Sequence, residues 1–310
     1  MPDTAAPASE APGDCRDVLM VLVGALLISM KGVLAKLLYR EGVGIEVILL
    51  LRAWVSLPLV WAWAFYRVGP RAIARVAPNL VVGAALAGVT TYYLGAWLDF
   101  AALTLIDASL ERVLLFSYPV LVVIARAVMT RRWPARRVVG AVAMTYTGVI
   151  FAVGGFDRGL WGANAFGALL VLGSAASFAY FLIANERVAR AAGSVVFITF
   201  ASSGAALALG GHFALFGSVE QLDIPLRAWG LIVFMTAATN VVPLFMVSAS
   251  IRRIGAQRAA IVSSIGPPST IVLAMLVLGE VLHPPQVLGA ALIIAGILVL
   301  EVRRPQRSPA

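Results

Sequence analysis

The 310-residue sequence has few charged residues, one cysteine and two histidines. Charged residues make up 13 % of it, about half of the roughly 25 % that is usual in soluble domains. Cys15 alone cannot form an intramolecular disulfide, and His212 and His283 are too few for a zinc-hydrolase ligand set. No P-loop sequence occurs, which argues against ATP hydrolysis by this chain. We therefore expect neither a metal nor a cofactor.

What the sequence does contain is apolar residues, at 61 % of the chain against roughly 45–50 % in soluble domains. This composition indicates a membrane protein, and the lipid bilayer is its first expected partner. The formal net charge of +9 would otherwise suggest a nucleic-acid partner. The apolar fraction leaves no surface for a basic stripe, so nucleic acid is not an expected partner.

Long apolar segments recur along the whole chain. A helix needs roughly 20 apolar residues to cross a bilayer core of about 30 Å. Ten segments of about that length lie between charged clusters or Pro/Gly breaks: 18–39, 45–66, 79–103, 106–129, 137–155, 164–185, 194–216, 227–250, 256–278 and 285–302. They show no alternating pattern, so the fold class predicted is an all-α membrane protein with ten transmembrane helices.

The basic residues predict the orientation of these helices, because cytoplasmic loops are enriched in Lys and Arg. With a cytoplasmic N-terminus, sixteen arginines fall on the inner side and only Arg40, Arg158 and Arg227 on the outer side. Both termini are therefore expected in the cytoplasm. The tail at 1–17 is rich in Ala, Pro and acidic residues, lacks the basic region of a cleaved signal, and is expected to be disordered; residues 303–310 form the second tail.

The two halves of the chain contain similar segments. The segment that begins at Ile106–Ala108 and ends at Pro119 corresponds to the one that begins at Ile254–Ala256 and ends at Pro267. Trp133–Pro134 corresponds to His283–Pro285, and the glycines Gly140 and Gly148 correspond to Gly289 and Gly296. Residues 18–154 and 164–302 are thus predicted to be two five-helix repeats. Since five is odd, the second repeat enters the membrane from the opposite side, as in many secondary transporters. The alternative is a chance likeness between Ala/Val/Leu helices that contain proline.

These features resemble the EamA-type transporters of the drug/metabolite transporter superfamily. The resemblance rests on the ten-helix count, the paired halves, the segment from Asp107 to Pro119, and Pro267 followed by Leu278–Glu280 and Pro284–Pro285. It implies export of amino acids, other metabolites or drugs across a bacterial inner membrane, through a cavity between the halves. The first half departs from the pattern, with Arg131–Arg132 where Gly–Glu is usual.

Four charged residues in the predicted spans are the first candidates for substrate binding or coupling: Lys31, Asp99, Glu111 and Arg112. Charges in a bilayer are costly and by default face a cavity or a partner. One interpretation is a static ion-pair network that fixes helix packing. The other is that one carboxylate exchanges protons while a cation holds a carboxylate of the substrate.

Three further cations lie in spans. Lys36 and Arg126 are near span ends and are expected to extend to the interface. Arg52 is expected to form a structural ion pair, although the nearby Glu46 lies on a different helical face.

Uncharged candidates complete the predicted site: Tyr92, Tyr118, Asn240 and Ser264, with Pro119 and Pro267 as hinges. A proline frees a backbone carbonyl one turn earlier, which lipid tolerates only beside a neighbour or a water-filled cavity. Hydrogen bonding between packed helices is the alternative role for the polar residues. The predicted cavity lies between the first, third, fourth, sixth, eighth and ninth spans, while the glycines of the fifth and tenth suit a scaffold or a homodimer surface.

The favoured function is secondary export of a small metabolite by alternating access, with protons as a possible coupling ion. Two cations balance two carboxylates in the cluster, which favours a zwitterion or an organic acid over a cationic drug. Lipid or cationic drug efflux by the same fold stays open, as does a scaffold without transport. An intramembrane enzyme is the remote alternative, because the chain has no Gly-x-Ser-x-Gly elbow and no histidine within a span except His212.

Overall fold

The computed structural model describes residues 15–301, except 132–133, 244–245, 247–249 and 251–261. The described residues form helices and connecting turns without strands, which confirms the all-helical prediction. Most of both predicted tails, and the segment Ile254–Ala256 of the predicted repeat, lie outside the described residues. The first helix begins at Cys15, inside the segment predicted as a tail.

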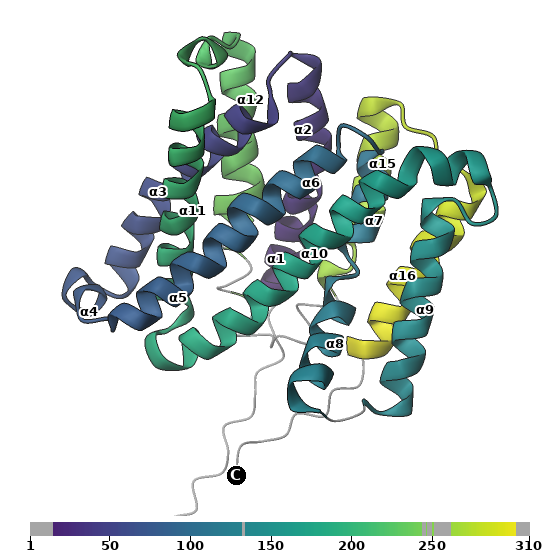
Figure 1. The fold of residues 1–310 in the computed structure, drawn as a ribbon, viewed down its shortest axis with the longest axis horizontal. Helices are drawn as coiled ribbons and strands as arrows, with labels where there is room; N and C mark the ends of the chain where they lie inside the picture. The colour runs from purple at the N-terminus through teal and green to yellow at the C-terminus, as the bar shows by residue number, and fades with distance from the viewer. Residues whose placement is uncertain (1–14, 132–133, 244–245, 247–249, 251–261, 302–310) are drawn as a thin grey trace, which may run out of the picture.

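The helices in chain order are α1 (Cys15–Ser29), α2 (Lys31–Arg40), α3 (Ile45–Arg67), α4 (Pro70–Ala74), α5 (Pro78–Gly88), the π-helix η1 (Val89–Gly95), α6 (Ala96–Ala102), α7 (Ala108–Leu115), α8 (Tyr118–Thr130), α9 (Arg136–Val153), α10 (Arg158–Ala192), α11 (Ser194–Phe216), the 3-10 helix η2 (Val219–Leu222), α12 (Leu226–Thr236), the π-helix η3 (Ala237–Val241), α15 (Gly266–Leu278) and α16 (Pro284–Glu301). Figure 1 shows them as one bundle.

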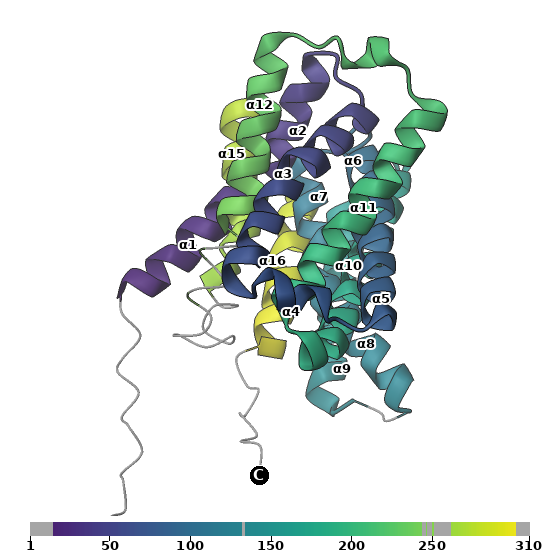
Figure 2. The same ribbon diagram turned by 90° about the vertical axis from the view of Figure 1, so that its left-hand side faces the viewer.

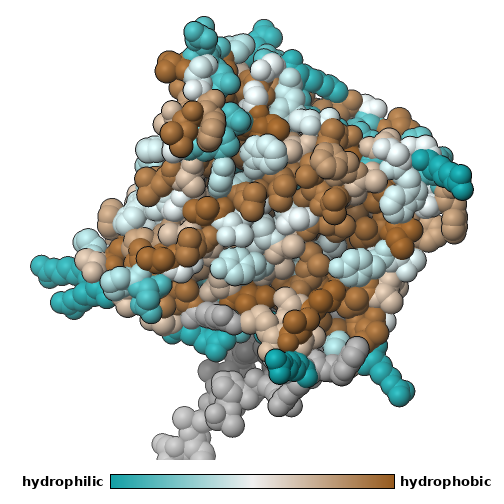
Figure 3. Space-filling view, in the orientation of Figure 1, coloured by the Kyte–Doolittle hydropathy of each residue, from teal (hydrophilic) through white to brown (hydrophobic). Residues whose placement is uncertain are grey.

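Seven helical segments of the described chain are long and apolar enough to cross a membrane: Arg16–Arg40, Ile45–Arg67, Pro78–Ala102, Ala108–Thr130, Arg136–Val153, Arg158–Ala192 and Ser194–Phe216. Three shorter apolar helices fall within the remaining predicted spans: Leu226–Val241, Gly266–Leu278 and Pro284–Val299. Apolar side chains also cover much of the molecular surface, with hydrophilic residues gathered toward its edges (Figure 3). The chain is therefore a helical membrane protein, since a water-soluble fold would bury these residues.

Several predicted spans are interrupted rather than continuous. The first is broken at Met30 between α1 and α2, and the fourth at Phe116–Ser117 between α7 and α8. Pro119 therefore lies in the first turn of α8, and Pro267 likewise lies in the first turn of α15. Both prolines follow a two-residue turn, at Phe116–Ser117 and at Ser264–Ile265, and their role as hinges stays a prediction.

Two π-helices interrupt the third and eighth predicted spans at the same distance from their starts. The π-helix η1 begins eleven residues after Pro78, and η3 begins eleven residues after Leu226. π-Helices are rare in proteins, and those that occur often lie at functional sites. The hydrophobic pattern did not predict either one, because one wide turn hardly changes a run of apolar residues.

Close glycine contacts join α9 to α16, which lie side by side in Figure 1. A Cβ atom on Gly148 would lie 2.8 Å from the carbonyl oxygen of Gly289, and one on Gly289 would overlap the backbone of Ala152. Gly148 and Gly289 are thus used for packing within this chain, which favours the scaffold interpretation for those faces, whereas Gly140 of α9 has open space around it.

The first and last described helices have their chain ends on the same side of the bundle. In Figure 2, α1 begins and α16 ends at the lower end, where α4 also lies. The opposite end, called the distal end below, is where α2 and α15 finish. There Nη2 of Arg40 donates a hydrogen bond of 3.1 Å to the carbonyl oxygen of Leu278.

Candidate functional site

Three of the four predicted charged residues meet in one cluster, called the Lys31 triplet. Lys31 is the first residue of α2, directly after the break at Met30. Its Nζ lies 2.5 Å from Oδ2 of Asp99 on α6 and 3.2 Å from Oε1 of Glu111 on α7. The Glu111 side chain is fully buried, and those of Asp99 and Lys31 are 4 % and 16 % exposed. One ammonium group therefore serves two buried carboxylates.

The triplet depends on close approach of α2 and α7. A Cβ atom on Gly32 would lie 3.2 Å from both Oε2 of Glu111 and Cβ of Ala108, so a larger residue there would press on the carboxylate. Oδ1 of Asp99 and Oε2 of Glu111 are buried and accept no hydrogen bond from the described residues. These two oxygens give the triplet the capacity to take up a further cation or a proton.

Arg112, the fourth predicted member, forms no ion pair with the carboxylates of the triplet, although its charge acts on Glu111. Its guanidinium lies beside Gly266, where an added Cβ atom would be 3.2 Å from Nη2 of Arg112. Ser29 and Thr270 join α1 to α15 at the same place, since Oγ of Ser29 donates to the Gly266 carbonyl (3.0 Å) and Oγ1 of Thr270 donates to the Ser29 carbonyl (2.9 Å). Arg112 forms no ion pair with a described residue, and its buried Nε has no acceptor among them.

Tyr92 and Tyr118 belong to an aromatic cluster centred on α10. Tyr92 contacts Phe181 with ring centroids 4.9 Å apart, and Tyr118 contacts Phe178 at 4.8 Å. Phe178 and Phe181 are stacked at 6.2 Å, one turn apart on α10. The two predicted tyrosines are thus brought to the same apolar wall.

Asn240 lies in η3 and binds Arg52, which the sequence had paired with a carboxylate. Nη2 of Arg52 donates a hydrogen bond of 2.9 Å to Oδ1 of Asn240, and its Cζ lies 5.0 Å from the centroid of the Phe100 ring. The predicted ion pair of Arg52 is wrong for the described residues, which place no carboxylate within 4.0 Å of it. Ser264, the remaining predicted residue, lies in the turn before α15.

Lys36 extends toward the distal end, near the end of its span as predicted, and is ion-paired there. Its Nζ lies 3.3 Å from Oε1 of Glu280 and 3.5 Å from Oδ1 of Asp107. The Glu280 carboxylate also accepts hydrogen bonds from the backbone N–H groups of Ala108 and Ser109, at 2.8 and 3.0 Å, and from the Ser109 hydroxyl at 2.7 Å. Glu280 thereby caps the start of α7.

These contacts determine the charge state of Glu280, which lies beyond the end of α15. Partial burial raises the pKa of this carboxyl. The hydrogen bonds from Ser109 and Ala108, together with the positive charge of Lys36, lower it by more, so the pKa lies below its ordinary value. Glu280 is therefore ionised at neutral pH and holds the two halves of the chain together at the distal end.

Glu46, Tyr93 and His212 meet in a contact that the sequence did not predict. The Tyr93 hydroxyl lies 2.5 Å from Nδ1 of His212, and Nε2 of His212 lies 3.8 Å from Oε1 of Glu46. The three residues come from α3, η1 and α11, so no local spacing could have related them. Arg126, by contrast, lies near its span end as expected, and there it pairs with Glu186 of α10.

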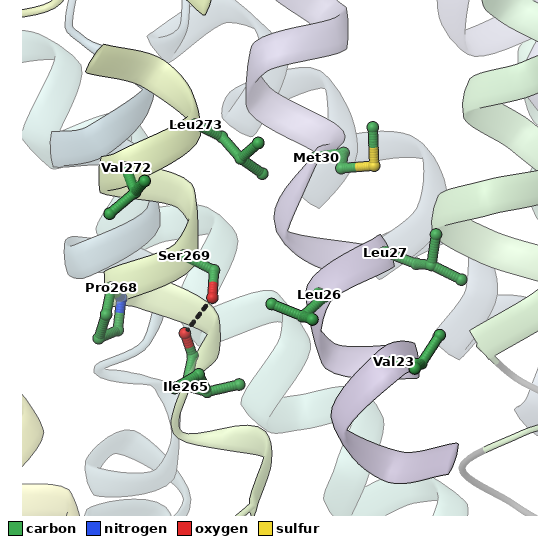
Figure 4. A pocket seen from close by; sticks show the side chains of 9 residues that line it. All are labelled: Val23, Leu26, Leu27, Met30, Ile265, Pro268, Ser269, Val272 and Leu273. Atoms are coloured by element: carbon green, nitrogen blue, oxygen red, sulfur yellow. Dashed lines mark hydrogen bonds between the residues drawn. The ribbon is translucent and has the colours of Figure 1, made fainter. Parts of the chain in front are cut away.

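An apolar pocket of about 630 Å³ lies between α1 and α15 (Figure 4). Its lining residues are Val23, Leu26, Leu27, Met30, Ile265, Pro268, Ser269, Val272 and Leu273. The Ser269 hydroxyl donates its hydrogen bond of 2.8 Å to the Ile265 carbonyl and so offers no free donor to a ligand. The pocket joins the first and ninth predicted spans, two of the six expected around the cavity, but none of the predicted substrate residues lines it.

The chain is similar to a protein family, to a curated protein and to solved structures. Residues 165–302 match the EamA-like transporter family. The chain is 31 % identical over 291 residues to the "Uncharacterized transporter YcbK" of Bacillus subtilis (strain 168), covering 92 % of this chain and 93 % of that protein. A solved crystal structure with 18 % identity aligns over 92 % of this chain and 96 % of the other, with a TM-score of 0.59, which indicates a shared fold.

Proposed function

The chain belongs to the EamA-like transporter family of the drug/metabolite transporter superfamily, and on this premise we propose that it exports a small metabolite by alternating access. It is a membrane transporter, and we propose that it acts without enzymatic activity of its own. The proposed substrate is a zwitterion, such as an amino acid, or another organic acid. The proposed location is the inner membrane of a bacterium.

We propose ten membrane crossings in two inverted five-helix repeats, with both termini in the cytoplasm. The matching positions of η1 and η3 support a repeat, as do the prolines in the first turns of α8 and α15. The left-handed residues that end these two helices, Arg131 and Gly279, also correspond. The arginine distribution supports the orientation.

The Lys31 triplet is the observation that carries the proposed mechanism. Its single ammonium contacts two buried carboxylates, so the three contacting groups carry one excess negative charge when all are ionised. A proton on Glu111 or the ammonium group of a substrate would remove that excess. Because both compete for the same carboxylates, binding of one favours release of the other, which is the requirement for proton-coupled export.

Flux measurements in proteoliposomes test this proposal. A panel of amino acids and organic acids is loaded into vesicles, and protein-dependent efflux is followed with and without a pH gradient. We expect efflux of at least one zwitterion or organic acid to be accelerated by the gradient. In Glu111→Gln, whose side-chain oxygen can still accept from Lys31, we expect the gradient to lose its effect while substrate exchange without a gradient continues.

Glu186→Gln is the matched control, because Glu186 is a half-exposed carboxylate that pairs with Arg126 at the surface. It should retain the response to the pH gradient. If Glu111→Gln responds to the gradient as the wild type does, the role of Glu111 in coupling is rejected. If no solute of the panel shows protein-dependent flux, export of that class is rejected.

The apolar pocket between α1 and α15 favours a second candidate, efflux of a lipid or of an amphipathic drug. Its lining offers hydrocarbon contacts and no free polar group, which suits an acyl chain or an aromatic drug rather than an amino acid. Fluorescent lipid and cationic dye added to the same vesicles separate the candidates. A bulky polar change, Val272→Gln, should reduce lipid or dye movement and leave metabolite flux intact if the pocket serves the apolar cargo.

A further inference from the structure

Arg52 is a cation inside a membrane-spanning helix whose contacts are all uncharged. It lies in α3, with Nη2 bound to the amide oxygen of Asn240 and the guanidinium over the Phe100 ring. Its Nε is buried and has no acceptor among the described residues. Burial of a charge in this way is costly unless a partner of opposite charge is supplied.

The chain itself supplies no such partner in the described structure. Asp99 attracts Arg52 electrostatically, but no oxygen of Asp99 lies within 4.0 Å of the guanidinium, and its Oδ2 is held by Lys31. Glu46, in the first turn of α3, lies beside His212. Residues 244–261, which follow η3 and include most of the undescribed positions in the body of the chain, contain neither Asp nor Glu.

The groups around Arg52 are arranged for an oxyanion. The planar guanidinium still has N–H donors, including Nε, directed away from its one described acceptor. Oδ1 of Asn240 accepts the hydrogen bond from Arg52 and also lies 3.4 Å from the Thr239 hydroxyl. The amide nitrogen of Asn240 donates to no described residue. Guanidinium groups commonly bind carboxylate or phosphate through two parallel N–H groups, and an amide N–H group beside them can add a further donor. It lies, moreover, at the π-helix η3, where the backbone is already distorted.

We propose that Arg52 and Asn240 form an oxyanion subsite that binds the carboxylate or phosphate group of the transported substrate. This inference deepens the proposed function and rests on it for the identity of the ligand as cargo. The Lys31 triplet, with excess negative charge, would then take the ammonium end of a zwitterion while Arg52 takes the acidic end. The substrate would supply the carboxylate or phosphate that the described residues do not place beside Arg52.

Asn240→Asp is the decisive variant, because it places a carboxylate where Oδ1 of Asn240 now lies, 2.9 Å from Nη2 of Arg52. The purified full-length protein in detergent is unfolded by heat with increasing sodium succinate or sodium phosphate, at ionic strength matched with sodium chloride. We expect at least one oxyanion to raise the wild-type unfolding temperature in a saturable way. In Asn240→Asp we expect the apparent dissociation constant to rise at least tenfold, since the new carboxylate occupies the subsite.

Asn79→Asp is the matched control, since it adds the same charge at an exposed position in the first turn of α5. It should bind the oxyanion as the wild type does. If Asn240→Asp does not fold, Arg52→Lys replaces it as the test variant. It keeps the positive charge but loses the planar guanidinium, so it should also weaken oxyanion binding about tenfold. The succinate and phosphate series separately identify a carboxylate or a phosphate as the preferred group.

Absence of any oxyanion-dependent stabilisation of the wild type overturns the proposal, as does wild-type affinity in Asn240→Asp. Flux measurements in proteoliposomes distinguish failure of the oxyanion subsite from failure of the proposed export. If oxyanions stabilise the wild type and not Asn240→Asp, but no solute is transported, the subsite stands and export is rejected. If zwitterions are transported equally by the wild type and Asn240→Asp, export stands and the subsite is rejected.

Discussion

Lys31 and Arg52 are both cations within membrane-spanning helices, yet their surroundings are opposite. Lys31 contacts two carboxylates, those of Asp99 and Glu111, at 2.5 and 3.2 Å. Arg52 contacts an amide oxygen and an aromatic ring and has no carboxylate within 4.0 Å among the described residues. Lys31 therefore has two groups of opposite charge in contact, whereas Arg52 has none among the described residues. A buried cation in a membrane-spanning helix can thus be paired within the chain, as Lys31 is, or lie beside uncharged groups, as Arg52 does.

Loss of the Lys31 cation should have the largest effect on stability. Lys31→Met removes the ammonium shared by Asp99 and Glu111 and leaves two buried carboxylates without a counter-ion. We expect the free energy of unfolding to fall by about 3–5 kcal/mol. Thermal and denaturant unfolding in detergent would measure the loss. The double variant Lys31→Met/Asp99→Asn should recover part of the lost stability, because it leaves one buried carboxylate instead of two. If Lys31→Met is as stable as the wild type, the distinction between Lys31 and Arg52 is rejected.

The distal-end carboxylate should give an intermediate and pH-dependent effect. Glu280→Gln keeps the shape of the side chain but removes the charge that binds Lys36, Ala108 and Ser109, and we expect a loss of about 2 kcal/mol at neutral pH. Because folding lowers the pKa of Glu280 from its ordinary value of 4.5, its charge contributes stability above pH 4.5. That contribution disappears as the pH falls through the lowered pKa.

The unfolding temperatures of the wild type and Glu280→Gln should therefore converge as the pH is lowered from 7 to below 4. A constant difference across this range would show that the charge of Glu280 is not responsible. Glu220→Gln, an exposed carboxylate in η2, is the control and should follow the wild type at every pH.

Removal of the second buried cation should have the smallest effect on the ligand-free protein. Arg52→Met loses one hydrogen bond to Asn240 but also removes the unfavourable burial of a charge that lacks a counter-ion. We expect the free energy of unfolding to change by less than about 1 kcal/mol in either direction. Unfolding without added oxyanion would measure it beside Lys31→Met. A loss as large as that of Lys31→Met would show that Arg52 has a structural partner after all.

Much of this organisation is predictable from sequence because membranes impose simple rules. Each predicted span contains a described apolar helix, since any segment in lipid must be both apolar and internally hydrogen-bonded. The association of Lys31 with Asp99 and Glu111 was also predicted, because charges within spans seek one another. Other features escaped prediction, because they depend on contacts between distant segments. Glu280 binds Ser109 across 171 residues, and Arg52 binds Asn240 across 188.

The sequence by itself determined that this protein is a helical membrane protein and which of its charges are costly to bury. Composition, span length and charge position suffice for that, because the bilayer acts on each segment separately. Only the tertiary structure decided which cation receives a carboxylate. Helical periodicity relates residues on one face of one helix, whereas Lys31 and Arg52 differ in what α6, α7 and η3 bring to them. That difference follows from the packing of the helices against one another.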